Sequence, residues 1–444
     1  MKKSKVILLV LIFMAFFIAT ACSKVDSILP SPTAAPEAIE AVVEEPAEEE
    51  AMEDIYDAIE ETIQEPPRES ADPGQSEKQE QLDRISEGTE HTVMESLYHV
   101  TAVAAGYDFT LAIKEDGSLW GWGNNSSGEL GLGMWEWPLI PMRIMGNVAY
   151  VAAGYGHTMA ITTDGVLWGW GWNVSGQIGD GTTYSRFYPT RLMDNVIHVA
   201  CGRDFTMVVT ADGSLWGWGF NANGELGRYG DDEYHLPVLI MENIRYVAAG
   251  AHTGFAITTD NQLWGWGWNG SGQLGDGTFD ERRAPVYIMS NVAMVSAGFD
   301  YTLMITTNGE LWGIGNNNFG ELGGGAVDFH TSPIFLRENV VYVAAGFAHT
   351  MIITTAGELL ASGQNENGQL GIPERWPRRQ FVYIMDDVAL VALGQGHTVA
   401  ITRDGALYAW GLNHEGQLGN GRTQTHDTPQ VIIQPVESLD SHSA

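Results

Sequence analysis

The sequence predicts an all-β fold, a seven-bladed β-propeller built from 48-residue repeats. The string Ala-Ala-Gly, or a near match to it, ends on Gly106 and returns every 48 residues until Gly394, which makes seven copies without an insertion. Each copy also contains four short apolar stretches of the kind that form strands. Units too small to bury their own apolar faces must stack, and seven units suit a closed ring better than the alternative, an open solenoid of sheets.

The amino terminus resembles the signal peptide of a bacterial lipoprotein. Three lysines precede an apolar stretch, residues 6–19, that is short for a membrane-spanning helix. The sequence Ile-Ala-Thr-Ala-Cys at residues 18–22 is similar to a lipobox, except that Ala stands where Leu is usual. We therefore expect residues 1–21 to be removed and Cys22 to be lipidated. The alternative is an ordinary signal peptide cleaved after Ala-Thr-Ala.

Residues 22–98 have the composition of a disordered tether. Between Ser23 and Tyr98 the chain holds 22 of its 56 carboxylates and only four Lys or Arg. Such a segment cannot bury enough apolar surface to offset the entropy that ordering would cost. We expect it to reach up to about 250 Å from the lipid anchor. We also expect a short disordered tail at residues 434–444.

Each repeat between residues 99 and 433 is expected to form four antiparallel strands. In the second copy the apolar stretches are residues 148–153, 158–162, 167–171 and 189–193. The second and third stretches are separated by Asp-Gly, which favours a type I′ hairpin turn with positive φ at both central residues. Three of the other six copies repeat this pair, and the remaining three keep Asn or Gly there.

Some positions are the same in all seven copies, which favours a structural role. An Asn follows every third strand (Asn125 to Asn413), with a Gly two residues before it (Gly123 to Gly411). Asn bonds its own backbone and Gly fits positive φ, so we interpret these residues as loop-forming and not as a ligand ring. The paired Trp of the third strand, such as Trp168 and Trp170, we interpret as packing between blades and not as a stacking platform.

The repeat resembles the RCC1 (regulator of chromosome condensation) repeat. The shared pattern is Ala-Ala-Gly-x-x-His-Thr-x-x-Ile-Thr-x-Asp-Gly-x-Leu-Trp-x-Trp-Gly-x-Asn-x-x-Gly-Gln-Leu-Gly, and the resemblance covers about residues 99–433. It implies a seven-bladed propeller. It implies less about function, because the eukaryotic founder binds chromatin and exchanges nucleotide on a small GTPase, whereas bacterial members include a secreted protein inhibitor of β-lactamases.

The negative charge of the chain and its expected export argue against chromatin binding and against nucleotide exchange on a small GTPase. The chain carries 56 Asp or Glu and 22 Lys or Arg, and from residue 99 onward these numbers are 34 and 15. A protein that binds nucleic acid needs a basic face, and no Lys or Arg cluster here exceeds a pair. We therefore expect no nucleic acid partner. An exported chain would also not meet a cytosolic GTPase.

The loop after the first strand and the long loop after the third should lie on one face of the ring, because the strands run up and down. The long loops vary between copies and are rich in aromatic residues and Arg, which dominate interface energies. We expect them to bind a partner; the alternative is local packing. The candidates are Trp135, Trp137, Trp172, Tyr184, Arg186, Phe187, Tyr188, Tyr229, Tyr234, Trp268, Phe279, Arg282, Arg283, Phe329, Trp376, Arg378 and Arg379.

Catalysis has one candidate, a ring of ionisable residues that follow the repeated Gly and would suit a metal ion. Because these residues recur at turn and strand-start positions, we favour a structural role. No nucleophile triad, paired-carboxylate site, HExxH motif or phosphate loop occurs in the sequence, so we expect no catalytic residue, metal or cofactor. The members of the ring are Asp108, His157, Asp204, His252, Asp300, His349 and His397.

We expect a monomeric, non-enzymatic recognition protein, lipid-anchored on the extracellular or periplasmic side of the cell membrane, that binds another protein. One alternative is a glycan-binding module that uses exposed Trp as stacking platforms. Another is a propeller hydrolase or lyase. We also expect the two ends of the domain to pair and close the ring, and the tether to enter on the face opposite the long loops.

Overall fold

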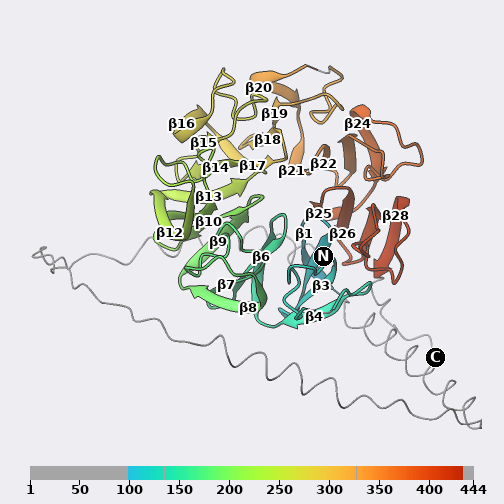
Figure 1. Cartoon of the computed structure of the whole chain (residues 1–444). Coiled ribbons are helices and arrows are strands. Elements are labelled where there is room, and N and C mark those ends of the chain that lie inside the picture. Colours follow the sequence, from blue (N-terminus) through green and yellow to red (C-terminus); the bar gives the residue numbers. More distant parts are fainter. Residues whose placement is uncertain (1–98, 135, 327, 434–444) are drawn as a thin grey trace, which may run out of the picture. The chain divides into compact units, whose positions relative to one another are not determined.

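A computed structural model describes residues 99–134, 136–326 and 328–433. They form seven four-stranded antiparallel sheets arranged as the blades of a ring, and these residues contain no helix (Figure 1). The described ranges thus include no helix with the length and apolar character needed to cross a membrane. The predicted seven-bladed β-propeller is confirmed. The predictions for residues 1–98, including Cys22, and for 434–444 lie outside the described residues.

The four strands of each blade are neighbours in space in the order in which they occur in the chain. The innermost strands surround the channel: β1 (Val100–Ala105), β5 (Val148–Ala153), β9 (Val196–Cys201), β13 (Ile244–Ala249), β17 (Val292–Ala297), β21 (Val340–Ala345) and β25 (Val388–Leu393). The second strands are β2 (Phe109–Lys114), β6 (His157–Thr162), β10 (Phe205–Thr210), β14 (Thr253–Thr258), β18 (Tyr301–Thr306), β22 (His349–Thr354) and β26 (His397–Thr402). The third strands are β3 (Leu119–Gly123), β7 (Leu167–Gly171), β11 (Leu215–Phe220), β15 (Leu263–Gly267), β19 (Leu311–Gly315), β23 (Leu359–Gly363) and β27 (Leu407–Gly411). The outermost strands are β4 (Met142–Met145), β8 (Arg186–Met193), β12 (Glu233–Met241), β16 (Arg282–Met289), β20 (His330–Arg337), β24 (Arg378–Met385) and β28 (His426–Ile433).

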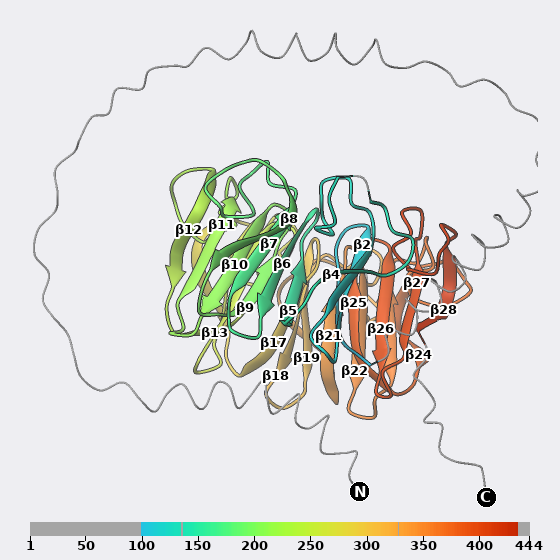
Figure 2. The ribbon, with the colours of Figure 1, turned by 90° about the horizontal axis from the view of Figure 1, so that it is seen from below.

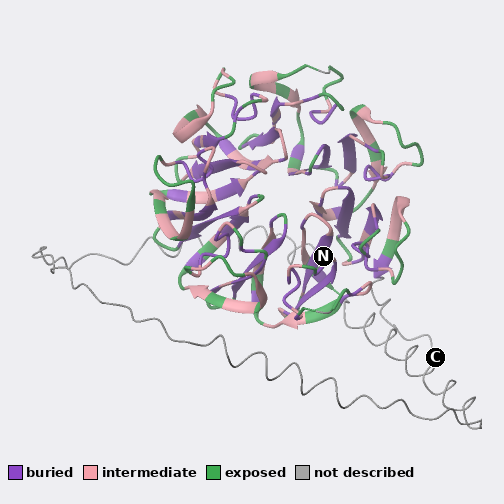
Figure 3. Cartoon of the chain, in the orientation of Figure 1, coloured by how far each residue is buried: buried purple, intermediate pink, exposed green. Residues whose placement is uncertain are grey.

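Burial is greatest in the second strands. Every residue of β6, β10 and β22 is buried, because neighbouring blades cover both faces of these strands. The residues of the outermost strands β8 and β20 are instead half-buried or exposed, and further exposed residues lie in the loops (Figure 3). The core therefore lies between the blades, around the ring.

The hairpin turns between the second and third strands differ from the expected type I′ turn. In the first blade, Gly117 N donates to Lys114 O at 2.9 Å and Lys114 N donates to Ser118 O at 2.9 Å, which makes a three-residue loop. Gly117 has φ 76°, whereas Asp116 is not among the residues with positive φ. The Asp instead accepts a hydrogen bond from Ser118 N at 2.9 Å. Only the Gly position of the Asp-Gly pair therefore requires positive φ.

The fourth strands begin earlier than expected. In the second blade the prediction starts at Pro189, but β8 starts at Arg186, which pairs with Gly171 beyond an irregularity in the ladder. Gly171 has φ 100°, and a Cβ there would lie 2.5 Å from the Gly156 carbonyl oxygen. This close approach explains why Gly ends the third strand in every copy.

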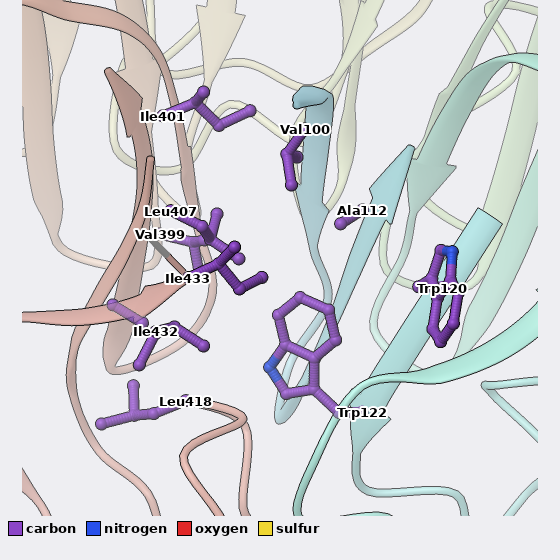
Figure 4. Close-up of a cluster of buried hydrophobic side chains, with 11 residues drawn as sticks. Val100, Ala112, Trp120, Trp122, Val399, Ile401, Leu407, Leu418, Ile432 and Ile433 are labelled. Atoms are coloured by element: carbon purple, nitrogen blue, oxygen red, sulfur yellow. The ribbon is translucent and has the colours of Figure 1, made fainter. Parts of the chain in front are cut away.

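The ring closes through packing between the first and last blades. Each of these blades is a complete sheet of consecutive strands, so the expected pairing of the two chain ends is wrong. Instead, Trp122 of β3 shares a buried cluster with Leu418, Ile432 and Ile433 of the last blade (Figure 4). The Trp122 Nε1 donates a hydrogen bond to the Gln417 carbonyl oxygen at 2.9 Å. Six further clusters fill the other junctions, so the closing junction resembles the rest.

Candidate partner-binding face

The loops divide between the two faces of the ring, which Figure 2 shows from the side. We call the face with the short loops after the innermost strands and the long loops after the third strands the loop face. The opposite, hairpin face carries the hairpin turns and the links between blades. His99 lies on the hairpin face, because its carbonyl oxygen accepts a hydrogen bond from Glu115 N of the first hairpin turn at 3.0 Å. Ile433 ends β28 opposite Leu407, just after the last hairpin turn, and so lies on the same face.

The repeated Asn holds the long loops in shape. In the second blade the Asn173 Oδ1 accepts a hydrogen bond from Ile178 N at 2.8 Å, and its Nδ2 donates to Thr182 O and Tyr184 O at 3.0 Å each. All seven equivalent Asn residues are buried. The loop-forming role predicted for them is confirmed.

The Trp of the third strands packs between blades, as predicted. The Trp170 Nε1 donates to Glu129 O of the preceding blade at 2.8 Å, and Trp170 is fully buried. Its partner in the pair, Trp168, is half-buried. The fully buried Trp residues are therefore not available for stacking on a ligand.

Most of the predicted aromatic candidates are exposed. Tyr184 and Trp376 each have 75% of their surface exposed, the highest fraction among them. Trp135 lies outside the described residues. Their role in binding stays a prediction. The exposed candidates are Trp137, Trp172, Tyr184, Tyr188, Tyr229, Trp268, Phe279, Phe329 and Trp376.

The predicted Arg candidates belong to the fourth strands and not to the loops. Arg186 begins β8, and its Nε donates to the Asp180 Oδ2 of its own loop at 2.6 Å. The Arg378 Nη2 bonds Glu374 at 3.0 Å in the same way. These ion pairs fix the loops to the strands. The candidates that lie in fourth strands are Arg186, Phe187, Tyr188, Tyr234, Arg282, Arg283, Arg378 and Arg379.

Several of these residues also have structural contacts with other parts of the propeller. Arg282 pairs with Asp276 of its loop, and Arg283 bonds both Glu281 and the Ala222 carbonyl oxygen of the preceding blade. Phe187 packs against Gly128 of the preceding blade. The Tyr234 ring lies under the Arg228 guanidinium, 5.1 Å from centroid to Cζ. For these positions, local packing is an observed role.

The ring of His and Asp separates into two layers. His157, His349 and His397 begin second strands and are fully buried. The His157 Nε2 lies 3.0 Å from the Thr206 hydroxyl, which itself donates to Gln177 O. Burial lowers the pKa of each of these His residues to about 3, so they are neutral. The favoured structural role is confirmed for these three.

The other members, Asp108, Asp204, His252 and Asp300, lie in the short loops of the loop face. In the residues that the structure describes, no group of three or more His, Cys, Asp or Glu is placed to hold a metal ion. Three of the four instead contact the long loop of the preceding blade: Asp108, Asp204 and His252. The Gln417 Nε2 donates to the Asp108 Oδ1 at 3.2 Å, and the His252 Nδ1 lies 3.3 Å from the Glu225 Oε1.

Carboxylates therefore mark the junctions between blades on the loop face, which sequence reasoning missed. At the position of Gln417, four long loops carry Gln, and three of the four short loops that face them carry Asp at the position of Asp108. The other three long loops carry Glu there, and the short loops that face them carry His, Gly or Ala. Burial raises the pKa of Asp108 to about 6 and that of Glu321 to about 7. The six carboxylates are Asp108, Glu129, Asp204, Glu225, Asp300 and Glu321.

Aromatic side chains from four of the seven blades lie in the short loops around the channel mouth, and these were also missed. The rings of Tyr107 and Tyr155 are 4.0 Å apart, those of Phe299 and Phe347 are 4.4 Å apart, and the Arg203 guanidinium lies over Tyr155. All five residues directly follow the repeated Gly. The sequence contained a signal for them, because the residue after the constant Gly varies from copy to copy.

Comparison with known families identifies the repeats. The profile of the RCC1-like domain matches residues 72–304. The chain belongs to the RCC1-like domain family. Profiles of the regulator of chromosome condensation (RCC1) repeat match residues 292–321, 340–369 and 388–417, and also 308–353 and 404–442. The resemblance inferred from the repeat pattern is confirmed.

Solved structures share the fold of this RCC1-like propeller. Human WBSCR16 is 23% identical with a TM-score of 0.65, and the match covers 72% of this chain and 94% of that protein. Prp20p from Saccharomyces cerevisiae is 22% identical with a TM-score of 0.61, covering 68% of this chain and 82% of that protein. At these identities the similarity shows the fold alone. No curated protein sequence matches the chain.

The loop face of the RCC1-like propeller thus combines exposed aromatic rings with carboxylates. Aromatic rings supply apolar contact area, and their faces attract cations. Carboxylates supply hydrogen-bond acceptors and negative charge. This chemistry suits recognition of another macromolecule by surface contact.

Proposed function

We propose that this RCC1-like protein is a non-enzymatic recognition protein that binds another protein through its loop face. The observation that carries the proposal is the concentration of exposed aromatic side chains there, on the long loops and around the channel mouth. Aromatic residues on loops held by a rigid scaffold dominate the energetics of many interfaces. Yeast Prp20p, which has the same fold, was described with its binding properties to Gsp1p and histones, so protein binding occurs on this fold.

We further propose that the protein is a monomer anchored by a lipid at Cys22 to the outer side of a cell membrane. The signal-like stretch at residues 6–19 and the lipobox-like residues that follow it support this. His99, where the described propeller begins, lies on the hairpin face, so the chain leading from the anchor joins the face away from the candidate residues.

Lipid anchoring predicts that Cys22→Ser releases the protein from membranes or leaves it as uncleaved precursor. Two or more acyl chains on one Cys give stable attachment, at about 0.8 kcal/mol for each buried methylene. Cell fractionation with immunoblotting measures the result, and Cys201→Ser is the matched control because this cysteine belongs to β9. A Cys22→Ser protein that stays on membranes and is processed like wild type would contradict the proposal.

Photocrosslinking in the native cell tests partner binding. A photoreactive phenylalanine analogue replaces Tyr155 or Phe347 on the loop face, or Thr163 on the hairpin face as the control; all three positions are exposed. We expect the two loop-face positions to yield a protease-sensitive adduct that glycosidases do not remove. Adducts from Thr163 alone would contradict the proposal.

The exposed Trp residues favour glycan binding as the second candidate. Trp172 and Trp268 each have 41% of their surface exposed on the loop face. They belong to the second and fourth blades, so one complete blade separates them. A crosslinked adduct that resists protease but is removed by glycosidase would support this candidate in place of protein binding.

A further inference from the structure

We infer that the central channel holds a binding site for a small, uncharged molecule with a flat ring and a polar substituent. The ligand would pack against the side chains of Tyr150, His198 and Tyr246. These residues occupy the same position in the innermost strands β5, β9 and β13 of three successive blades. The site is separate from the loop-face residues that carry the proposed function, so either proposal can fail without the other.

The innermost strands enclose a cavity of about 230 Å³, and residues of all seven blades line it. Small side chains leave this space open. The fifth residue of every innermost strand is Ala, except for Ser296 in the fifth blade, and six of these seven residues line the cavity. A cavity of roughly 150 Å³ is enough to hold benzene. The channel therefore has room for one aromatic ring with a substituent.

Aromatic side chains form one side of the cavity. The rings of Tyr150 and His198 are 5.0 Å apart and tilted by 40°, and those of His198 and Tyr246 are 4.6 Å apart and tilted by 44°. All three residues line the cavity and are only half-buried, although they belong to innermost strands. Stacked and tilted contacts between rings are favourable, so this row of rings is a surface against which a flat ligand can pack.

The two phenol groups of this row offer hydrogen bonds to a ligand. Neither the Tyr150 hydroxyl nor the Tyr246 hydroxyl is hydrogen-bonded to another residue that the structure describes. A hydroxyl can both donate and accept, so the pair suits a ligand group that does the same, such as an amide. Pockets for small molecules typically combine an apolar or aromatic lining with a few polar groups of this kind.

The lining disfavours charged ligands. The described residues around the cavity include no Asp, Glu, Lys or Arg. Burial lowers the pKa of His198 to about 4 and raises the pKa values of Tyr150, Tyr246 and Cys201, so the titratable side chains of the lining are neutral at pH 7. A charged ligand would lose its hydration here without meeting an opposite charge. An uncharged ligand does not carry this cost.

The test uses the full chain with 13C-labelled tyrosine rings, and benzamide, benzoate and benzamidinium as probes. The three probes share one shape but are neutral, negative and positive at pH 7. We expect benzamide to shift the ring signals of Tyr150 and Tyr246 in a saturable way, as measured by NMR. Neither charged analogue should displace it.

The variant Tyr150→Phe/Tyr246→Phe keeps both rings and removes both hydroxyls. It should bind benzamide at least about fivefold more weakly, which is the effect of losing one hydrogen bond. The matched control is Tyr188→Phe/Tyr287→Phe, which changes two exposed tyrosines of outermost strands and should bind like wild type. Melting temperatures verify that both variants fold.

Two results would overturn the inference. If benzamide shows no saturable binding up to about 10 mM, or binds the Tyr150→Phe/Tyr246→Phe variant as well as wild type, the site is wrong. If benzoate or benzamidinium displaces benzamide at equal concentration, the uncharged class of ligand is wrong. Neither result changes what photocrosslinking shows about a protein partner on the loop face.

Discussion

Individual buried side chains determine the form of the loop face. Asn125 is fully buried, and its Oδ1 accepts a hydrogen bond from Leu130 N at 2.9 Å. Its Nδ2 donates to Gly133 O and Glu136 O at 2.9 Å each. One amide therefore satisfies three backbone groups, and two of these hydrogen bonds are buried, which explains why every copy keeps the Asn.

Asn125→Ala should lower the free energy of unfolding by about 3 kcal/mol, because it leaves buried backbone groups unpaired. The adjacent Asn124→Ala is a matched control. Asn124 is half-buried and accepts one hydrogen bond, from the exposed Ser126 N at 2.8 Å, so its loss should cost less than about 1 kcal/mol. Urea unfolding measures both values, and equal losses would contradict the structural role of the repeated Asn.

His157→Phe should make the protein less sensitive to acid. The folded His157 stays neutral down to its pKa of about 3, whereas the unfolded chain takes up a proton near the ordinary value of 6.5. Stability is therefore complete above pH 6.5 and is lost as the pH falls from 6.5 toward 3. Phe fits, because Phe109 and Phe205 occupy the equivalent buried position in other blades.

The stability of His157→Phe relative to wild type should rise by about 2 kcal/mol from pH 7.5 to pH 5. The raised pKa values of Asp108 and Glu321 act in the opposite direction, because these carboxyls bind protons more readily in the folded state. They are present in both proteins, so their contribution cancels in the difference. Urea unfolding at the two pH values measures it, and an unchanged difference would show that the buried His does not control acid stability.

At the scale of elements, the hairpin turn gives a test of backbone geometry. Gly165 has φ 79°, and a Cβ there would lie no closer than 3.6 Å to any atom, so a side chain has room. Asn261 holds the equivalent place in the fourth blade with φ 65°. Gly165→Asn should therefore leave the melting temperature nearly unchanged. Gly165→Ala should cost about 1 to 2 kcal/mol, because Ala tolerates this conformation poorly. Equal effects would contradict the assignment of strain to φ.

Apolar patterns predicted strands such as β5 and β7 well. They did not show which residues form the contacts between blades. The bounds of β5 and β7 agree with the prediction because their residues are continuously apolar. The start of β8 was missed because Arg186 and its polar neighbours look like a loop before their pairing with Gly171 is known. At the site, variation between copies pointed to the long loops. Contacts such as Gln417 with Asp108 join residues far apart in the chain, so no local pattern shows them.

At the scale of the whole molecule, closure depends on the last strand. Deleting residues 427–444 removes most of β28, including Ile432 and Ile433, which pack against the first blade. Burial of two such side chains contributes about 4 kcal/mol, so melting temperature should fall sharply and proteolysis of the first and last blades should increase. Deleting 434–444 alone leaves β28 intact and should change little. A 427–444 deletion that melts like wild type would show that the closing junction does not stabilise the ring.

Because each blade forms from one uninterrupted stretch of 48 residues, the ring has no obligatory beginning. The two ends of the described propeller, His99 and Ile433, belong to adjoining blades. Both lie on the hairpin face, where the links between blades also run. Joining these ends with a short linker and reopening the chain at another link, such as the one between Asn243 and Ile244, would cut no sheet. The point at which the preceding chain joins the propeller could thereby be moved from blade to blade around the ring. The seven junctions between blades would stay the same.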